Sequence, residues 1–298
     1  MPAALLVVDA PFLLYRSFFA LPESITGVDD RPVGALLGAA NALLRVAADR
    51  GPRAIVLCFG AEAARYRVEL FAGYHATRPP VPDALAWQFD QAPDFFAAFG
   101  WPSHGSDELE ADDLLGAFAR VEAAAGGRTL ILTGDRDMYQ CVGPSATVLY
   151  LKSGTTGFEE VDAQEVVRRY GIPPELVPDF IALRGDPSDG LPGAPGIGPK
   201  TAAELLQRHG SLEAAIAAVG SPDHPKVAHG ERPRVAAALR DHADQLRAYR
   251  EIALLRPVNL DRPPDAPTDL PGGAAGARAL GLNALAKRLE AAGSLSDL

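Results

Sequence analysis

Cysteine is scarce in this chain of 298 residues, which contains only Cys58 and Cys141. Two cysteines exclude a disulfide-stapled scaffold, and no His and Cys residues stand at the spacing of a zinc site. No basic leader segment is visible, and the best apolar stretch, residues 5–21, is interrupted by Asp9 and Arg16. That stretch is too short to span a membrane. We therefore expect a cytoplasmic protein that does not bind membranes.

Basic residues are also in deficit. The chain has 28 Lys and Arg against 38 Asp and Glu, which gives a net charge of −10. Because nucleic-acid-binding proteins are usually basic, the total charge taken alone argues against that function. Hydrophobic residues make up 48% of the chain, which excludes a chain that is disordered throughout. The charge balance would change if many of the acids surrounded metal ions.

Apolar runs alternate with helical patterns in the first half of the chain. The predicted strands cover residues 4–9, 54–59, 129–133 and 147–151, and the predicted helices cover residues 33–49, 82–99 and 107–125. Ser106 is the expected cap of the last of these helices. The alternation predicts an α/β fold with a parallel sheet.

Helical segments dominate after about residue 162. They cover residues 163–170, 174–184, 200–209, 212–219 and 233–250. Residues 257–276 are rich in Pro, Gly and Asp and are predicted as a loop or linker, followed by a last helix over residues 280–292. We expect three parts: an α/β domain over residues 1–172, a smaller all-helical region over 173–256, and a linker with a C-terminal helix over 257–298.

Acidic residues gather where the predicted strands end. Asp9 ends the first strand, and Asp135 and Asp137 follow the third. Ligands bind at the carboxyl ends of the strands in an open parallel sheet, so these acids are expected to share one edge. A helix start and a later turn add more acids, which makes eight candidates in all: Asp9, Glu110, Asp112, Asp113, Asp135, Asp137, Asp186 and Asp189.

Eight neighbouring carboxylates repel one another unless cations lie between them. Ligands that are all oxygen favour Mg²⁺ or Mn²⁺, and paired ions of this kind hydrolyse phosphodiesters. Each acid taken alone is equally consistent with a helix cap or a turn. In a regular helix Glu110 and Asp113 share a face while Asp112 points about 160° away from Glu110, so all three cannot ligate one ion.

Closely spaced glycines precede the predicted helix over residues 200–209. The segment Gly196-Ile-Gly198-Pro199-Lys200-Thr201 exposes backbone N–H groups at a helix N-terminus beside a lysine, which suits a nucleic-acid phosphate. Its spacing is not that of a P-loop, and a plain loop between helices is the alternative. Residues 66–80 mix tyrosines with arginines, which is typical of nucleic-acid contacts but equally of an amphipathic helix.

Together these motifs resemble the 5′-nuclease family, which includes the N-terminal domain of bacterial DNA polymerase I, phage 5′ nucleases and flap endonucleases. The resemblance runs from Leu5 to about Arg256. Asp9 with Tyr15-Arg16 matches the opening segment of the family. Four further segments match in order and spacing: Glu110-Ala-Asp-Asp113, Thr133-Gly-Asp-Arg-Asp-Met-Tyr-Gln140, Gly185-Asp-Pro-Ser-Asp-Gly-Leu-Pro-Gly193 and Gly196-Ile-Gly-Pro-Lys-Thr201.

The resemblance implies a PIN-like, metal-dependent nuclease domain with a helical arch and an acidic site for two or more Mg²⁺ or Mn²⁺ ions. It also implies a helix–three-turn–helix region that grips DNA through a hairpin, where K⁺ binds. The implied hairpin residues are Gly196, Gly198, Lys200 and Thr201. Tyr74 is implied to stack on a base, and Arg16 and Arg78 to steer the scissile phosphate, with His75 where the family usually has an arch lysine.

The implied activity is that of a stand-alone 5′→3′ exonuclease and flap endonuclease, which acts as a monomer on 5′ ends, nicks and flaps of DNA in primer removal and repair. Gly60 departs from the family, which usually has Asp there, so Gly60→Asp is expected to raise the rate at limiting Mg²⁺. A DNA-junction binder that has lost catalysis is the alternative. A haloacid-dehalogenase-like phosphatase is disfavoured because Ala10-Pro11, and not a second Asp, follows Asp9.

Overall fold

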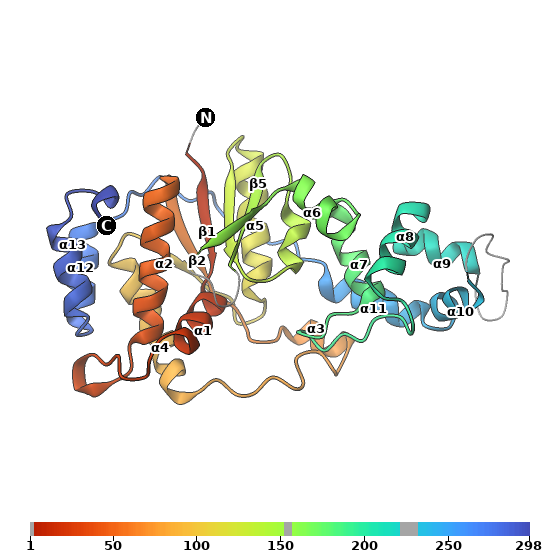
Figure 1. Cartoon of the computed structure of the whole chain (residues 1–298), viewed down its shortest axis with the longest axis horizontal. Helices are drawn as coiled ribbons and strands as arrows, with labels where there is room; N and C mark the ends of the chain where they lie inside the picture. Colours follow the sequence, from red (N-terminus) through yellow and green to blue (C-terminus); the bar gives the residue numbers. More distant parts are fainter. Residues whose placement is uncertain (1–2, 152–156, 221–231) are drawn as a thin grey trace.

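The computed structural model describes residues 3–151, 157–220 and 232–298, and its centre is a six-stranded sheet (Figure 1). The strand order is β3-β2-β1-β4-β5-β6, in which β6 alone runs antiparallel to its neighbour. The strands are β1 (Leu5–Asp9), β2 (Ala54–Cys58), β3 (Ser103–His104), β4 (Thr129–Thr133), β5 (Ala146–Leu151) and β6 (Phe158–Val161). The predicted α/β fold with a parallel sheet is confirmed.

Strand β1 is buried on both faces because successive side chains point to opposite sides. Leu6 and Val8 face one layer of helices, and Leu5 and Val7 face the other. The first layer comprises α1 (Ala10–Ala20), α2 (Gly34–Arg50), α4 (Asp83–Ala97), α12 (Leu270–Ala279) and α13 (Asn283–Ala291), with the short turns η1 (Val28–Asp30) and η4 (Leu295–Asp297).

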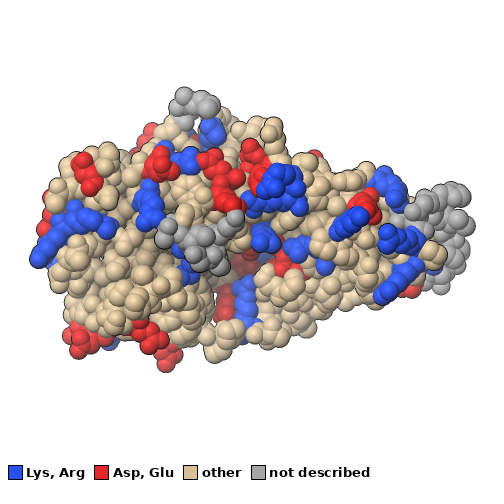
Figure 2. Space-filling model, viewed as in Figure 1, with Lys and Arg blue, Asp and Glu red and all other residues tan. Residues whose placement is uncertain are grey.

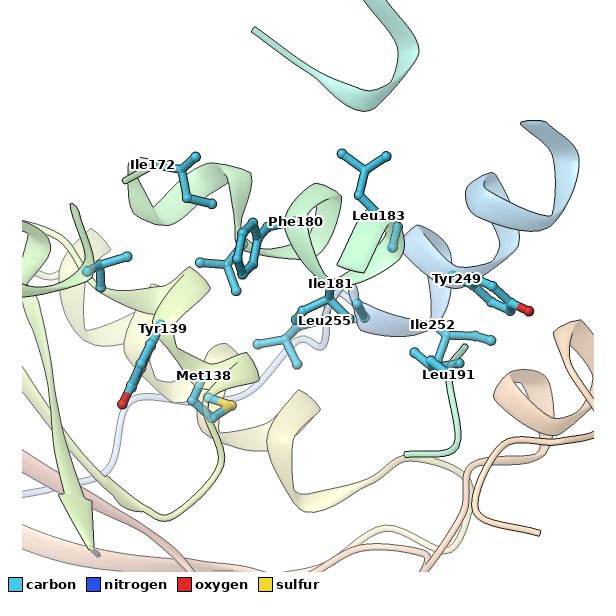
Figure 3. Packing of buried hydrophobic residues seen from close by; sticks show 14 of the residues in the cluster. Met138, Tyr139, Ile172, Phe180, Ile181, Leu183, Leu191, Tyr249, Ile252 and Leu255 are labelled. Carbon is cyan, nitrogen blue, oxygen red and sulfur yellow. The ribbon is translucent and has the colours of Figure 1, made fainter. Parts of the chain in front are cut away.

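The opposite face carries α5 (Ala111–Ala124) and continues into the helical region. That region comprises η2 (Asp137–Cys141), α6 (Ala163–Tyr170), η3 (Pro174–Leu176), α7 (Val177–Arg184), α8 (Pro199–His209), α9 (Leu212–Val219), α10 (Pro233–Asp241) and α11 (Ala243–Ala253). Figure 3 shows Met138 of η2, Ile181 of α7 and Ile252 of α11 packed in one cluster. One apolar core therefore joins the sheet to the helical region, which fixes the position of each relative to the other.

The N-terminal boundary of α5 differs from the prediction. Ser106 accepts hydrogen bonds from the backbone nitrogens of Glu108 and Leu109 and so closes a turn, and the helix begins four residues later than expected, at Ala111. The predicted helix over residues 233–250 is two helices, α10 and α11, which meet at His242. Strands β3 and β6 and helix α1 were not predicted.

Helix α12 lies in a stretch that was predicted as linker. Asp269 caps it by accepting a hydrogen bond from the backbone nitrogen of Gly272. A β-carbon on Gly272 would lie 2.3 Å from the carbonyl oxygen of Ala98, and one on Gly273 would lie 2.4 Å from the ring of Phe99. These glycines allow the helix to pack directly on the end of α4, so they favour the helix here through contact and not through propensity.

The segment between β2 and α4 is the region expected as a helical arch. It contains one short helix, α3 (Arg65–Leu70), followed by turns and an extended stretch that leads to α4 (Figure 1). Among the described residues, no helix has the length and apolarity that crossing a membrane requires.

Candidate active site

Two neighbouring strands end beside each other and present the first acids of the site. Asp9 ends β1, and its carboxylate accepts hydrogen bonds from the Thr133 hydroxyl at 2.7 Å and from the Phe12 backbone nitrogen at 3.0 Å. Past the end of β4, the backbone nitrogen of Asp135 donates to Thr133, and that of Asp137 donates to the Asp135 carboxylate. The strand ends and their turns thus hold Asp9, Asp135 and Asp137 in fixed directions.

Helix α5 and the loop after α7 bring further acids to the same place. Burial and the charges of Asp135 and Asp9 raise the pKa of Asp112 well above its usual value. Burial and the charges of Asp135, Asp189 and Asp186 likewise raise the pKa of Asp137. Six acids therefore lie within electrostatic reach of one another, and we call them the acid cluster: Asp9, Asp112, Asp135, Asp137, Asp186 and Asp189.

Cations only partly balance the acid cluster. Arg78 contacts the Asp189 carboxylate at 3.3 Å and lowers the pKa of Asp9, although burial raises that pKa overall. Arg184 donates to Asp186 at 2.9 Å. Burial and the repulsion from Asp189 raise the pKa of Asp135 to about 7. The cluster therefore carries more negative charge than its surroundings neutralise, which is the condition under which carboxylates take up either protons or metal ions.

The donor atoms of the acid cluster are all carboxylate oxygens, the chemistry that Mg²⁺ and Mn²⁺ prefer. Within residues 3–151, 157–220 and 232–298, however, no group of three or more His, Cys, Asp or Glu side chains is arranged to hold a metal ion. The donor chemistry fits a hard divalent ion, and the side chains would have to converge further to ligate it.

Asp113 does not face the acid cluster, which corrects its prediction as a metal ligand. Its buried carboxylate lies 3.2 Å from Arg67 Nη2 and accepts hydrogen bonds from the backbone nitrogens of Arg256 and Glu110. Glu110 lies on the same side and pairs with Arg67 Nη1 at 2.6 Å. The two acids therefore share a face that points away from Asp112, as the helical spacing requires.

Tyr74 is 5% exposed, which contradicts its expected role of stacking on a base. Its hydroxyl donates to Glu110 at 2.9 Å, and its ring stacks on the His75 ring with centroids 3.9 Å apart. The Tyr74 ring therefore stacks on another side chain of the protein.

His75 ties the arch segment to the loop after α7. Its Nε2 lies 3.1 Å from the Asp189 carboxylate and its Nδ1 lies 2.9 Å from the Glu62 carbonyl oxygen. Both partners are acceptors, so both hydrogen bonds form together only when both ring nitrogens carry protons. Arg78 is the more exposed cation here, with 41% of its side chain accessible. Arg16 lies in α1, which begins directly after Asp9.

Gly60 packs against the start of α5. A β-carbon at this position would lie 2.3 Å from the Ala111 backbone nitrogen and 2.6 Å from the Leu109 carbonyl oxygen. An aspartate therefore cannot replace Gly60 without moving the backbone, which contradicts the expectation that Gly60→Asp improves the site.

The glycine hairpin lies in the loop that also carries Asp186 and Asp189. Gly196 has a φ of +76°, and Gly198 precedes Pro199, Lys200 and Thr201 in the first turn of α8. The Lys200 side chain is 91% exposed. A β-carbon on Gly196 would lie 3.1 Å from Nε of Arg234, so α10 supplies a second cation to the hairpin. Figure 2 shows Lys and Arg side chains along this helical part of the molecule.

Sequence reasoning missed Arg67, Arg184 and Arg234 as partners of the site. Arg184 directly precedes the Gly185 motif, and its position two residues before Asp186 could have indicated that the two side chains pair. Arg67 and Arg234 contact residues more than 35 positions away in the chain, and no local pattern indicates such contacts.

Two consecutive segments of this chain match a known protein family. Residues 4–171 match the family described as 5′-3′ exonuclease, N-terminal resolvase-like domain, and residues 172–266 match 5′-3′ exonuclease, C-terminal SAM fold. The chain belongs to the 5′-3′ exonuclease family.

Two relatives illustrate the range of this family. A 5′-3′ exonuclease of Streptomyces coelicolor is 36% identical to this chain over 310 residues, in an alignment that covers 98% of each protein. A DNA polymerase I of Mycobacterium bovis is 35% identical over 88% of this chain, which spans only 28% of that polymerase.

Solved structures share the fold at low sequence identity. The T5 D15 protein co-crystallised with metal ions has a TM-score of 0.69 at 15% identity, over 96% of this chain and 98% of that one. A complex of the same T5 flap endonuclease with DNA and metal ions has a TM-score of 0.64 at 16% identity, over 99% of this chain and 100% of that one.

Proposed function

We propose that this chain is a metal-dependent 5′→3′ exonuclease and flap endonuclease that hydrolyses phosphodiester bonds near 5′ ends and flaps of DNA. The observation that carries the proposal is the acid cluster, in which six buried or half-buried carboxylates from four segments meet with too few cations to balance them. Family membership and a structural neighbour seen with DNA and metal ions support the same activity.

The proposed ligands of two or more Mg²⁺ or Mn²⁺ ions are the six carboxylates of the acid cluster. When bound, such ions generate a nucleophile from water at neutral pH and stabilise the leaving oxygen. The Thr133 hydroxyl and the Phe12 backbone nitrogen hold the Asp9 carboxylate in position. Arg78, whose partly exposed side chain lies 3.3 Å from the Asp189 carboxylate, is proposed to attract the scissile phosphate, and Arg16 of α1 is proposed to act with it.

The hairpin is proposed to hold the duplex without reading its sequence. Gly196 and Gly198 bring the backbone close to a phosphate, and Lys200 and Thr201 lie at the N-terminus of α8, where N–H groups and the helix dipole favour anions. By family resemblance, K⁺ is the ion that we propose for this turn.

Cleavage of a 5′-flapped duplex tests the proposal. We expect product with Mg²⁺ or Mn²⁺ and none with EDTA, and cleavage by Asp135→Asn on the order of 10³-fold slower with either ion. The competing candidate, a junction-binding protein without catalysis, is motivated by Gly60 and His75, which stand where the family usually has Asp and Lys. It predicts tight binding of the flap with no product at any metal concentration.

The salt dependence of DNA binding tests the hairpin separately. Lys200→Ala should lower the slope of log K against log salt by about one unit, because one phosphate contact is lost. Lys287→Ala on α13 is the matched control and should leave the slope unchanged. Equal slopes for all three proteins would show that Lys200 does not contact phosphate.

A further inference from the structure

Arg67 is a buried cation that the proposed chemistry does not use. It lies on α3 and is 2% exposed. Its Nη1 lies 2.6 Å from Glu110 Oε2, its Nη2 donates to Asp113 Oδ1 at 3.2 Å, and its Nε donates to the Ile252 carbonyl oxygen at 3.0 Å. One guanidinium therefore joins the arch segment, the start of α5 and the end of α11.

The partners of Arg67 enclose the first turn of α5. Glu110 is the residue before the helix, and its backbone nitrogen donates to Asp113 Oδ2 at 3.3 Å. The backbone nitrogen of Arg256 donates to Asp113 Oδ1 at 2.8 Å. Residues of a helix are about 100° apart, so Asp112 points elsewhere when Glu110 and Asp113 are held on this side. Among the acids that raise the pKa of Asp112, Asp135 and Asp9 have the largest effects, ahead of Glu110.

The charge of Arg67 divides the acids of this turn into two groups. Glu110 and Asp113 contact it directly, while Asp112 lies among like charges whose effect on its pKa the guanidinium offsets only in part. Without the guanidinium, two buried carboxylates would lose their partner, and repulsion among three acids within four residues would favour rotation of the turn.

We infer that Arg67 is a positioning residue that keeps Asp112 directed into the acid cluster by fixing the first turn of α5. It acts through Glu110 and Asp113 and does not itself contact the proposed metal ions. This inference rests on the proposed function, because it takes the acid cluster as the metal site.

The same helix offers a matched control at its other end. Glu122 is fully buried and pairs with Arg53 Nη2 at 2.5 Å, and the Arg53 side chain is 7% exposed. Arg53→Met and Arg67→Met therefore each remove a buried arginine from a buried glutamate of the same segment. A merely structural role predicts that both variants lose stability and that neither changes the affinity for metal ions.

The test is Mn²⁺ binding to the metal-free protein by calorimetry, together with thermal unfolding. We expect both variants to melt earlier, and Arg67→Met alone to bind Mn²⁺ roughly 10–100-fold more weakly, as loss of an outer partner of a metal site does. Excess Mn²⁺ should restore flap cleavage by Arg67→Met. Arg67→Lys, which keeps the charge but not the two-pronged geometry, should fall between the wild type and Arg67→Met, and it carries the test if Arg67→Met does not fold.

The outcomes separate this inference from the proposed function. Wild-type affinity in both Arg67 variants, beside Mn²⁺ binding by the wild type, would overturn the inference and leave the proposed function standing. Equal weakening in Arg53→Met would also overturn it, since the effect would then follow stability. A wild-type protein that neither binds Mn²⁺ nor cleaves flaps would overturn both.

Discussion

The two ends of helix α5 carry acids in opposite electrostatic settings. At the C-terminal end, Glu122 accepts hydrogen bonds from Arg53 and Arg262 and is fully buried. At the N-terminal end, Asp112 lies among Asp135, Asp9 and Glu110. The two acids therefore differ in the balance of nearby charge: cations surround Glu122, whereas mainly carboxylates surround Asp112.

The pKa values of Glu122 and Asp112 shift in opposite directions, as the difference in nearby charge predicts. Burial would raise the pKa of Glu122, but hydrogen bonds from Arg53 and Arg262 outweigh it, and the pKa is lowered. Burial and like charges both raise the pKa of Asp112. The C-terminal acid is stabilised as a carboxylate by the fold itself, and the N-terminal one would need an added cation to be so.

Removing a member of the acid cluster should have the largest effect. Asp135→Asn keeps the shape of the side chain but removes a charged oxygen. We expect the rate of flap cleavage at saturating metal to fall on the order of 10³-fold, because a bound metal ion lowers the activation barrier by several kcal/mol. Glu122→Gln at the other end of α5 should leave the rate within a few-fold. Similar rates for Asp135→Asn and the wild type would show that cleavage does not need the carboxylate of Asp135.

Asp113→Ala should act on stability, in contrast to Asp135→Asn. It breaks a buried ion pair with Arg67, so we expect a loss of about 3–5 kcal/mol in the free energy of unfolding. Glu122→Ala should lose a similar amount for the same reason, whereas Asp135→Asn should stabilise the metal-free protein by relieving repulsion. Urea unfolding in EDTA measures all three. A stable Asp113→Ala without activity would return Asp113 to the list of direct ligands.

The strand-end acids were predictable from sequence because the rule that places them is local. An apolar run followed by Asp predicts a buried strand with its acid at the sheet edge, and Asp9 and Asp135 lie as predicted. Helical periodicity also indicated that Glu110 and Asp113 share a face. It did not indicate which face meets the sheet edge, because that depends on where α5 begins and on the contact of Asp113 with Arg67.

Contacts between distant segments were not predictable. Tyr74 was assigned to base stacking by the family resemblance, in a segment that mixes tyrosines with arginines, but its hydroxyl donates to Glu110, 36 residues away. The helix at Leu270 was assigned to a linker because glycines disfavour helices in isolation, whereas close packing on Phe99 reverses that preference. In each case tertiary packing outweighed a correct local rule.

Gly60→Asp should have an intermediate effect on stability and on the rate of cleavage. It tests how tightly the N-terminal end of α5 is packed. Its side chain would enter the space of the Ala111 backbone, so we expect a loss of about 1–3 kcal/mol from overpacking and slower cleavage at limiting Mg²⁺. Gly143→Asp is the control, because nothing lies within 4 Å of a β-carbon there. Faster cleavage by Gly60→Asp would mean that the turn adapts and that an added ligand outweighs the strain.

The smallest expected effect is on the pH dependence of stability without metal, where Asp135 of the acid cluster and Glu122 of α5 should make contributions of opposite slope. Burial and repulsion from Asp189 raise the pKa of Asp135 from 3.8 to about 7, so the folded protein holds a proton that the unfolded chain releases. Its contribution to stability is therefore present at low pH and lost as the pH rises from about 4 to about 7. The lowered pKa of Glu122 makes a contribution that is present above pH 4.5 and lost as the pH falls below it.

Unfolding of the wild type, Asp135→Asn and Glu122→Gln in EDTA between pH 3 and 9 separates these two contributions. Asp135→Asn should reduce the decline between about pH 4 and 7, and the raised pKa values of Asp9, Asp112 and Asp137 should account for what remains. It should leave the acid limb in place, because Glu122 is unchanged. Glu122→Gln should flatten the acid limb and keep the decline, because Arg53 and Arg262 then pair with an uncharged amide at every pH. If Asp135→Asn keeps the full decline, Asp135 does not hold an extra proton in the metal-free fold, and the repulsion inferred for the acid cluster does not act on it.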